Sequence, residues 1–325
     1  MLTFARRGFA ALAAAALASL ASLALGAPPA VAQVKEIRVD WATYSPLSIV
    51  IRDQKLLEKE FEKDGVAVRW VQSLGSNKAL EFLNAGSLDF GSTAGAAALV
   101  AKINGNPIKA VGVTHRPEWT ALVARADATF KTAADLKGKA VAVTRGTDPH
   151  IFLVRALADA GLTEKDVKLV LLQHPDGKTA LLRGDVDAWA GLDPMMAQAE
   201  VEAGAKLFYR NPGAKTWGVL NTREDFAKAN PQIVKRVLAV YEQARQWALA
   251  NPKELAAALG AATKLPEAVV AKQLERSGFQ TAKIGAEQKE TILAAGNALQ
   301  KAGVLKDDVD MKATVEALVD SSYAN

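Results

Sequence analysis

The order of apolar and polar residues along the chain alternates between strand and helix patterns. Short apolar runs such as AVAV (140–143) and LVLL (169–172) are typical of strands that are buried on both faces of a parallel sheet. The pattern predicts strands at 36–42, 66–71, 88–91, 107–113, 120–125, 139–144, 167–172 and 186–191.

Helical patterns separate these strands. IFLVRALADAG (151–161) and PMMAQAEVEAG (194–204) each end at a glycine. The alternation predicts an α/β fold with right-handed crossovers. After about residue 222 only helical patterns remain, at 231–249, 252–260, 266–277, 286–302 and 309–319.

The first residues carry the pattern of an export signal. Arg6 and Arg7 precede an uncharged run (8–25), and Ala30-Val31-Ala32 forms a small-x-small site. A retained membrane anchor is the alternative, since the run approaches the ~20 residues that a spanning helix needs. Its alanine content and the A-x-A site favour cleavage after Ala32. The paired arginines leave the general and the twin-arginine routes open.

Charge and cysteine content narrow the function classes. Removing 32 of the 325 residues leaves 293, with 38 basic and 35 acidic residues, a net charge of +3. Acids and bases alternate, which is typical of a solvated surface and opposes nucleic-acid binding. The chain has no cysteine, so disulfides, thiolate nucleophiles and a lipid-modified cysteine are excluded. We expect two compact lobes, free in a periplasm.

Four predicted junctions between a strand and a helix are rich in small and hydroxylated residues. Ligands of open parallel sheets bind beyond the carboxyl ends of the strands. Free N–H groups and the helix dipole make such a junction suitable for an anion. The four are WATYSPLS (41–48), FGSTAGA (90–96), TRGTDPH (144–150) and GLDPMM (191–196).

Catalytic patterns are absent. The three histidines are His115, His150 and His174, and they have no HExxH spacing. No GxSxG elbow, GxGxxG or Walker A loop occurs. Thr147, Asp148 and His150 are too local to form a triad. We therefore expect a binding protein without a metal or cofactor, not an enzyme.

Three segments resemble signatures of the periplasmic sulfonate-binding proteins of ABC importers. They are ALEFLNAGSLDFGSTAGAAALVAKINGNPIKAVG (79–112), ADLKGKAVAVTRGTDPHIFLVRALADAGL (134–162) and VDAWAGLDPMMAQAE (186–200). The resemblance covers roughly residues 37–250. This family also includes taurine and nitrate binders and thiamine-precursor proteins.

The resemblance implies a periplasmic binding protein of type 2. Two α/β lobes are joined by two hinge strands, with the helical C-terminal tail on lobe 1. The expected ranges are a signal peptide at 1–32, lobe 1 at 33–114 and 216–325, and lobe 2 at 115–215. Such a monomer closes on a small organosulfur anion, here an aliphatic sulfonate, and delivers it to an ABC permease.

The expected ligand contacts come from the junctions and hinges. Thr93 and Thr147 would donate their hydroxyls and nearby N–H groups to an anionic oxygen, although Thr93 could instead cap a helix. Trp217 could wall the pocket or belong to the core. Arg116, near the outgoing hinge, could pair with an anion or be a surface residue. The full set is Tyr44, Ser45, Ser92, Thr93, Gly146, Thr147, Asp148, His150, Asp193 and Trp217.

Asp148 departs from the family pattern, as does Gly191-Leu192. Asp148-Pro149 and Asp193-Pro194 both read as Asp-Pro at a helix start, which suits an N-cap followed by a first helical proline. A carboxylate ~4 Å from a sulfonate would cost roughly 4 kcal/mol at an effective dielectric near 20. We expect Asp148 to cap its helix; the alternative is that it meets a cation or donor on the ligand.

Other ligands and functions stay open at this point. The ligand could be taurine, nitrate, another small organic anion or a thiamine-precursor pyrimidine. A pyrimidine-synthesis enzyme on the same fold would carry a cysteine-rich motif, which this chain lacks. A ligand-sensing regulator domain is opposed by the export signal and the missing DNA-binding helices.

Overall fold

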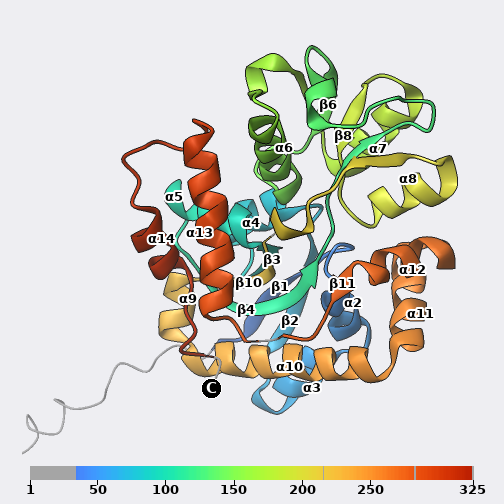
Figure 1. The fold of residues 1–325 in the computed structure, drawn as a ribbon. Coiled ribbons are helices and arrows are strands. Elements are labelled where there is room, and N and C mark those ends of the chain that lie inside the picture. Colours follow the sequence, from blue (N-terminus) through green and yellow to red (C-terminus); the bar gives the residue numbers. More distant parts are fainter. Residues whose placement is uncertain (1–33, 215, 282, 324–325) are drawn as a thin grey trace, which may run out of the picture. The chain divides into compact units, whose positions relative to one another are not determined.

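The computed structural model describes residues 34–214, 216–281 and 283–323. The strands form two separate sheets, each covered by helices, and these are the two lobes of the molecule (Figure 1). The predicted export signal (1–32) lies outside the described residues. Within the described ranges, no helix is long and apolar enough to cross a membrane.

The first sheet combines parallel and antiparallel strands in the order β11-β4-β10-β3-β1-β2. β1 runs parallel to β2 and β3, whereas β10 runs antiparallel to β3 and β4. The strands are β1 (Glu36–Trp41), β2 (Ala67–Gln72), β3 (Phe90–Ala94), β4 (Ile108–Pro117), β10 (Gly218–Arg223) and β11 (Ser277–Gly278).

The second sheet repeats this arrangement in the order β7-β6-β8-β5-β9. β6 is parallel to β7 and β8, and β5 is antiparallel to β8 and β9. The strands are β5 (Leu122–Ala124), β6 (Ala140–Val143), β7 (Lys168–Leu171), β8 (Ala188–Ala190) and β9 (Lys206–Tyr209).

The chain passes between the sheets twice, from β4 to β5 and from β9 back to β10. β5 and β10 are the first strands that the chain forms after each crossing to the other lobe. Each of them is antiparallel to its neighbours in the sheet. The predicted two-lobed α/β fold is therefore confirmed, and the AVAV and LVLL runs form the parallel pair β6 and β7, beside antiparallel strands in each sheet. The residue ranges predicted for the lobes remain a prediction.

Helices follow the strands of each sheet. In the first lobe these are α2 (Pro46–Asp53), α3 (Leu56–Phe61), α4 (Ser76–Asn84) and α5 (Gly95–Ile103). In the second lobe they are α6 (Asp148–Asp159), α7 (His174–Arg183) and α8 (Met195–Ala203).

The C-terminal tail is helical and packs on the first lobe, as predicted. α10 contacts α2 and α3, and α13 and α14 contact α5. The tail also reaches the second lobe, because α12 contacts α8 and α13 contacts α6. Its helices are α9 (Glu224–Ala229), α10 (Pro231–Ala250), α11 (Pro252–Thr263), α12 (Glu267–Glu275), α13 (Ala286–Lys301) and α14 (Met311–Leu318).

Some strands differ from the sequence-based expectation. The pattern did not predict β9, β10 or the two-residue β11 inside the helical tail. A two-residue strand is too short to show periodicity, and it forms by pairing with Arg116 and Pro117 of β4. β3 also extends to Ala94, so Ser92 and Thr93 lie in a strand and not in a loop.

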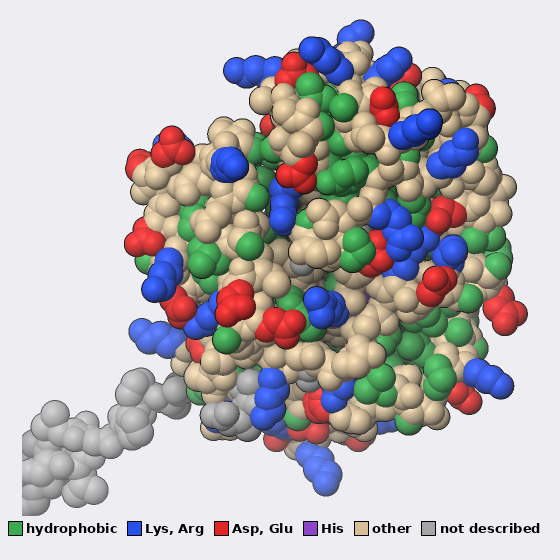
Figure 2. Space-filling model, viewed as in Figure 1, with side chains coloured by type: hydrophobic (Ala, Val, Ile, Leu, Met, Phe, Trp, Pro, Cys, Tyr) green, Lys and Arg blue, Asp and Glu red, His purple; other side chains and the backbone are tan. Residues whose placement is uncertain are grey.

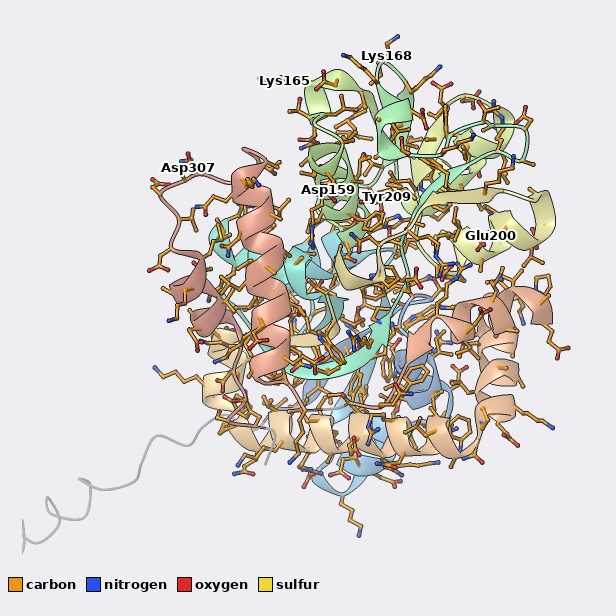
Figure 3. All side chains as sticks on the ribbon, viewed as in Figure 1. Asp159, Lys165, Lys168, Glu200, Tyr209 and Asp307 are labelled. Carbon is orange, nitrogen blue, oxygen red and sulfur yellow. The ribbon has the colours of Figure 1, made fainter. Side chains whose placement is uncertain are left out.

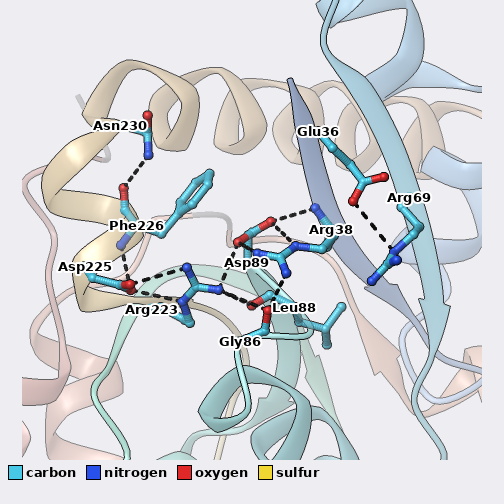
Figure 4. Close-up of polar contacts among 10 residues, drawn as sticks. All are labelled: Glu36, Arg38, Arg69, Gly86, Leu88, Asp89, Arg223, Asp225, Phe226 and Asn230. Atoms are coloured by element: carbon cyan, nitrogen blue, oxygen red, sulfur yellow. Dashed lines mark hydrogen bonds and ion pairs between the residues drawn. The ribbon is translucent and has the colours of Figure 1, made fainter. Parts of the chain in front are cut away.

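A charged network fastens the first sheet at the amino end of β3 (Figure 4). Asp89 of the GSLDFG segment is fully buried and accepts hydrogen bonds from Arg38 Nε at 3.0 Å and Nη2 at 2.7 Å. Arg223 Nη1 lies 3.1 Å from the same carboxylate. The network therefore ties β1, β3 and β10 together at the sheet edge opposite the strand-to-helix junctions.

Candidate functional site

Six helices begin where strands of the two sheets end at their carboxyl edges. In the first lobe these are α2, α4 and α5, and in the second lobe α6, α7 and α8. We call the starts of these six helices the junction region. Four of the six starts coincide with junctions predicted from the sequence; SLGSN (73–77) after β2 and LQHPD (172–176) after β7 were not predicted. The same rule, a strand followed directly by a helix start, would have found both.

The junctions of the two lobes touch one another. A Cβ atom on Gly75, at the start of α4, would lie 3.1 Å from Nε2 of His174, the first residue of α7. A Cβ on Gly146 would lie 3.7 Å from Cβ of Asn77. Gly146 has φ of +78°, a conformation that favours glycine. Residues from both lobes therefore surround one small region.

Tyr44 and Ser45 occupy the junction after β1. The Tyr44 hydroxyl donates to the Ser92 carbonyl at 3.0 Å, and its ring meets Trp119 edge-on. Ser45 precedes α2 but makes no side-chain cap. Its Oγ is buried and has no hydrogen-bond partner in the part of the chain that the structure describes. Ser45 thus offers a polar atom to a ligand, whereas the Tyr44 hydroxyl is already bonded.

Ser92 and Thr93 bond to residues inside the first lobe. The Ser92 N–H donates to Asp40 Oδ1 at 2.8 Å, and Ser92 Oγ donates to the same carboxylate. Thr93 Oγ1 donates to the Ala94 carbonyl and accepts from Asn221 Nδ2 at 2.8 Å. Burial raises the pKa of Asp40 to about 7. Contact of Ser92 or Thr93 with a ligand stays a prediction.

The predicted cap role of Asp148 is wrong. α6 begins at Asp148 itself, and the N-cap is Thr147, whose hydroxyl donates to the Thr144 carbonyl at 2.6 Å. Asp148 instead accepts from Trp119 Nε1 at 2.8 Å and from Thr216 Oγ1 at 3.3 Å. The side chain turns from the helix end because the two segments that cross between the lobes supply these donors.

His150 is the one histidine in the predicted set of ligand contacts. His150, in the first turn of α6, has its Nε2 2.9 Å from Oε1 of Glu164, which follows α6 in the sequence. The hydrogen bond from His150 is the main cause that lowers the pKa of Glu164. Contact of His150 with a ligand stays a prediction.

His174 was not among the predicted contacts. Its Nδ1 lies 3.2 Å from Thr144 Oγ1, and its Nε2 has no partner among the described residues. Burial lowers its pKa to about 3. Asn77 was not among the predicted contacts either, and its buried Oδ1 has no hydrogen-bond partner within the described ranges.

Asp193 lies at the start of α8 and binds two groups. Its Oδ1 accepts from the Ala197 N–H at 2.9 Å, and both carboxylate oxygens lie 3.3 Å from Arg276 Nη1. Burial raises the pKa of Asp193 to about 7, although Arg276 acts in the opposite direction. Asp193 is therefore fixed by protein groups, and its contact with a ligand stays a prediction.

Trp217 belongs to the same buried cluster as Tyr44 and Trp119. The guanidinium carbon of Arg116 lies 5.1 Å from the Trp217 ring centroid, and Arg116 Nη1 lies 3.8 Å from Glu287 Oε1. Since the Arg116 side chain is 65% exposed, the surface interpretation of this residue fits the structure.

Acidic residues are distributed unevenly over the six helix starts. α2, α4 and α5 have no acid in their first turns. In the second lobe, α6 and α7 carry Asp148 and Asp176 in their first turns, and Asp193 precedes α8. Helix amino termini are positive, so an anion is stabilised best on the first-lobe side.

The surface charges and the placement of titratable groups limit the kinds of ligand that the protein can bind. On the face shown in Figure 2, Lys and Arg are interspersed with Asp and Glu and form no continuous basic patch. Among the described residues, no group of three or more His, Asp or Glu side chains could hold a metal ion. The arrangement therefore suits binding of a small polar molecule by helix ends and side chains.

Comparison with known proteins agrees with this geometry. A family model described as "NMT1/THI5 like" matches residues 60–255, more than half of the chain. A protein of Escherichia coli (strain K12) named as an aliphatic sulfonates-binding protein is 29% identical over 272 residues, covering 82% of this chain and 85% of its own. The taurine-binding periplasmic protein of the same strain is 27% identical, covering 68% of this chain and 69% of its own.

The fold has a close match among solved structures. The alkanesulfonate-binding protein SsuA from Xanthomonas axonopodis pv. citri, bound to MOPS, superposes with a TM-score of 0.80. The match covers 89% of this chain and 99% of that chain at 24% sequence identity. This likeness shows that the two chains share the periplasmic binding protein fold.

Proposed function

The chain belongs to the NMT1/THI5-like family, and we propose that it is the periplasmic solute-binding component of an ABC importer. It binds a small organosulfur anion, an aliphatic sulfonate, between its lobes and carries out no catalysis. Relatives named for sulfonate and taurine binding support this function. The exported monomer closes on its ligand and presents the closed form to the permease.

One observation carries the proposal. Ser45 Oγ and Asn77 Oδ1 lie at the starts of α2 and α4, which have no acid in their first turns, and His174 Nε2 of α7 lies beside Gly75 at the start of α4. All three atoms are buried and lack partners among the described residues. Buried polar atoms are nearly always hydrogen-bonded to protein, water or ligand, so unpartnered groups gathered at helix starts support a polar ligand there. A sulfonate accepts from the Ser45 hydroxyl and selects the His174 tautomer with a proton on Nε2.

Calorimetry on refolded, ligand-free protein tests the proposal. We expect one-to-one binding of ethanesulfonate or taurine, and weaker binding of nitrate, which has no alkyl group to bury. Ser45→Ala and His174→Gln should each weaken binding by about 1.5–3 kcal/mol, the range for a hydrogen bond to a charged group. Thr179→Ala is the matched control, because this exposed hydroxyl on α7 bonds only locally, to the Pro175 carbonyl.

Two results would contradict the proposal. If the folded protein binds none of the sulfonates, the proposed ligand class is wrong. Ser45→Ala and His174→Gln variants that both bind as tightly as the Thr179→Ala control would show that the ligand lies elsewhere. Cell fractionation tests the location, since a mature form that begins near Gln33 should appear in the periplasm.

A further inference from the structure

Arg276 joins the two lobes through a buried ion cluster. Its Nη1 lies 3.3 Å from both oxygens of Asp193, and its Nη2 donates to Glu200. The side chains of Arg276 and Asp193 are 6% and 3% exposed, and that of Glu200 is 18% exposed. One guanidinium therefore binds two carboxylates with little access to water.

The partners of this cluster belong to different lobes. Arg276 ends α12 and directly precedes β11, which pairs with β4 of the first sheet. Asp193 follows β8 of the second sheet, and Glu200, labelled in Figure 3, lies on α8. α12 packs on α8 at this point. The ion pairs consequently exist only while the two lobes are together.

Asp193 also connects the cluster to the junction region. Its N–H donates to the Trp119 carbonyl at 2.9 Å, and its Oδ1 accepts from the Ala197 N–H. Trp119 in turn donates to Asp148 and packs on Tyr44. If Asp193 moves, the start of α8 and the segment that crosses between the lobes therefore move with it.

The intact ion cluster favours the closed arrangement of the lobes over a separated one. In a separated state all three groups regain water. In the closed state their attraction acts at low dielectric and offsets the loss of hydration only while all partners are present. Removing the guanidinium alone leaves two buried carboxylates without this partner, so the closed state becomes much less favourable.

We propose that Arg276 is a positioning residue that sets ligand affinity by holding the closed form through Asp193 and Glu200. This inference rests on the proposed function, since it takes the junction region as the ligand site. Arg276 does not act by touching the ligand. Its loss should therefore speed ligand release much more than it slows association.

The absence of cysteine permits a direct test of lobe position. Cysteines introduced at the exposed Lys168 of the second lobe and Lys253 of the first would carry spin labels for distance measurement. Arg276→Gln should lengthen the label distance, and ethanesulfonate should shorten it less than in the parent. Arg236→Gln is the matched control, because Arg236 pairs with Glu60 and Asp64 of its own lobe.

Binding measurements on the unlabelled variants complete the test. We expect Arg276→Gln to raise the Kd for ethanesulfonate at least tenfold, mainly through faster release in stopped-flow experiments. Glu200→Gln should have a smaller effect of the same sign, and Arg276→Lys should recover part of the affinity. The Tm of Arg276→Gln should fall less without ligand than with it, because only the closed fraction of the ligand-free protein contains the cluster.

The outcomes separate this inference from the proposed function. A parent protein that binds no sulfonate contradicts the function, while a longer label distance in Arg276→Gln would still support the cluster as a closing device. A parent that binds, together with an Arg276→Gln variant of equal Kd and label distance, overturns the inference. A Tm lowered equally with and without ligand also overturns it, since Arg276 would then stabilise both forms alike.

Discussion

Trp119 Nε1 donates a 2.8 Å hydrogen bond to Asp148 Oδ2, and this bond joins the segment between β4 and β5 to the first residue of α6. Thr216, on the segment that returns to β10, donates to the other oxygen of the same carboxylate. Thr216 Oγ1 also accepts from the Ala96 N–H in the first turn of α5. Both crossing segments and one helix start from each lobe therefore meet at Asp148.

Trp119→Phe tests the importance of this meeting point. Phenylalanine keeps the aromatic packing on Tyr44 but removes the donor to a buried carboxylate oxygen. We expect the free energy of unfolding in urea to fall by about 1–3 kcal/mol. Trp70→Phe is the control, because the Trp70 indole donates to Glu58 at a half-buried position. Equal losses in the two variants would show that burial of the Asp148 bond has no special effect.

Asp89→Asn should destabilise the first lobe without changing the ligand site. The substitution leaves Arg38 and Arg223 without their shared buried carboxylate. We expect a loss of about 2–4 kcal/mol in urea unfolding, below the full cost for a buried pair because both arginines are partly exposed. Ligand affinity should be unchanged, since Asp89 lies at the opposite sheet edge. The exposed pair Lys289–Glu316 provides the control Glu316→Gln, with an expected loss under about 1 kcal/mol.

His115 should lower stability in acid. Burial lowers its pKa to about 3, whereas the unfolded chain titrates near 6.5. Below pH 6.5 the unfolded state binds a proton that the folded state does not, so the free energy of unfolding falls by about 1.4 kcal/mol per pH unit toward pH 3. His115→Phe keeps the packing on Trp119 and Phe279. Between pH 7.5 and 4.5 it should gain up to about 3 kcal/mol relative to the parent; a constant difference would contradict this.

Asp40 should make the free energy of unfolding fall as the pH rises, the opposite of the effect of His115. Its folded-state pKa is raised to about 7 by burial, so the stabilising contribution of protonated Asp40 is present below about pH 4 and is lost as the pH rises to 7. Asp40→Asn keeps an acceptor for the Ser92 N–H and does not titrate. Relative to the parent, it should gain about 1.4 kcal/mol per pH unit between pH 4 and 7 in urea unfolding. A difference that does not vary with pH would contradict the raised pKa.

The sequence by itself determined the features that depend on near neighbours. Apolar runs such as AVAV and LVLL are strands, and the tail is helical because a period of about 3.6 is visible within one segment. Absence of cysteine excluded thiol chemistry, and strand-to-helix junctions predicted where a ligand binds. Ser45 was predicted as a ligand contact in this way, since it directly precedes a helix.

The tertiary structure alone decided which distant residues meet. Arg276 and Asp193 are 83 positions apart, and Asp148 lies 29 positions from Trp119 and 68 from Thr216. No local pattern contains such pairs. The capping rule for Asp148 failed because donors from both crossing segments compete with the helix end for its carboxylate. The reversed directions of β5 and β10 likewise follow from the passage of the chain between lobes, which strand periodicity does not record.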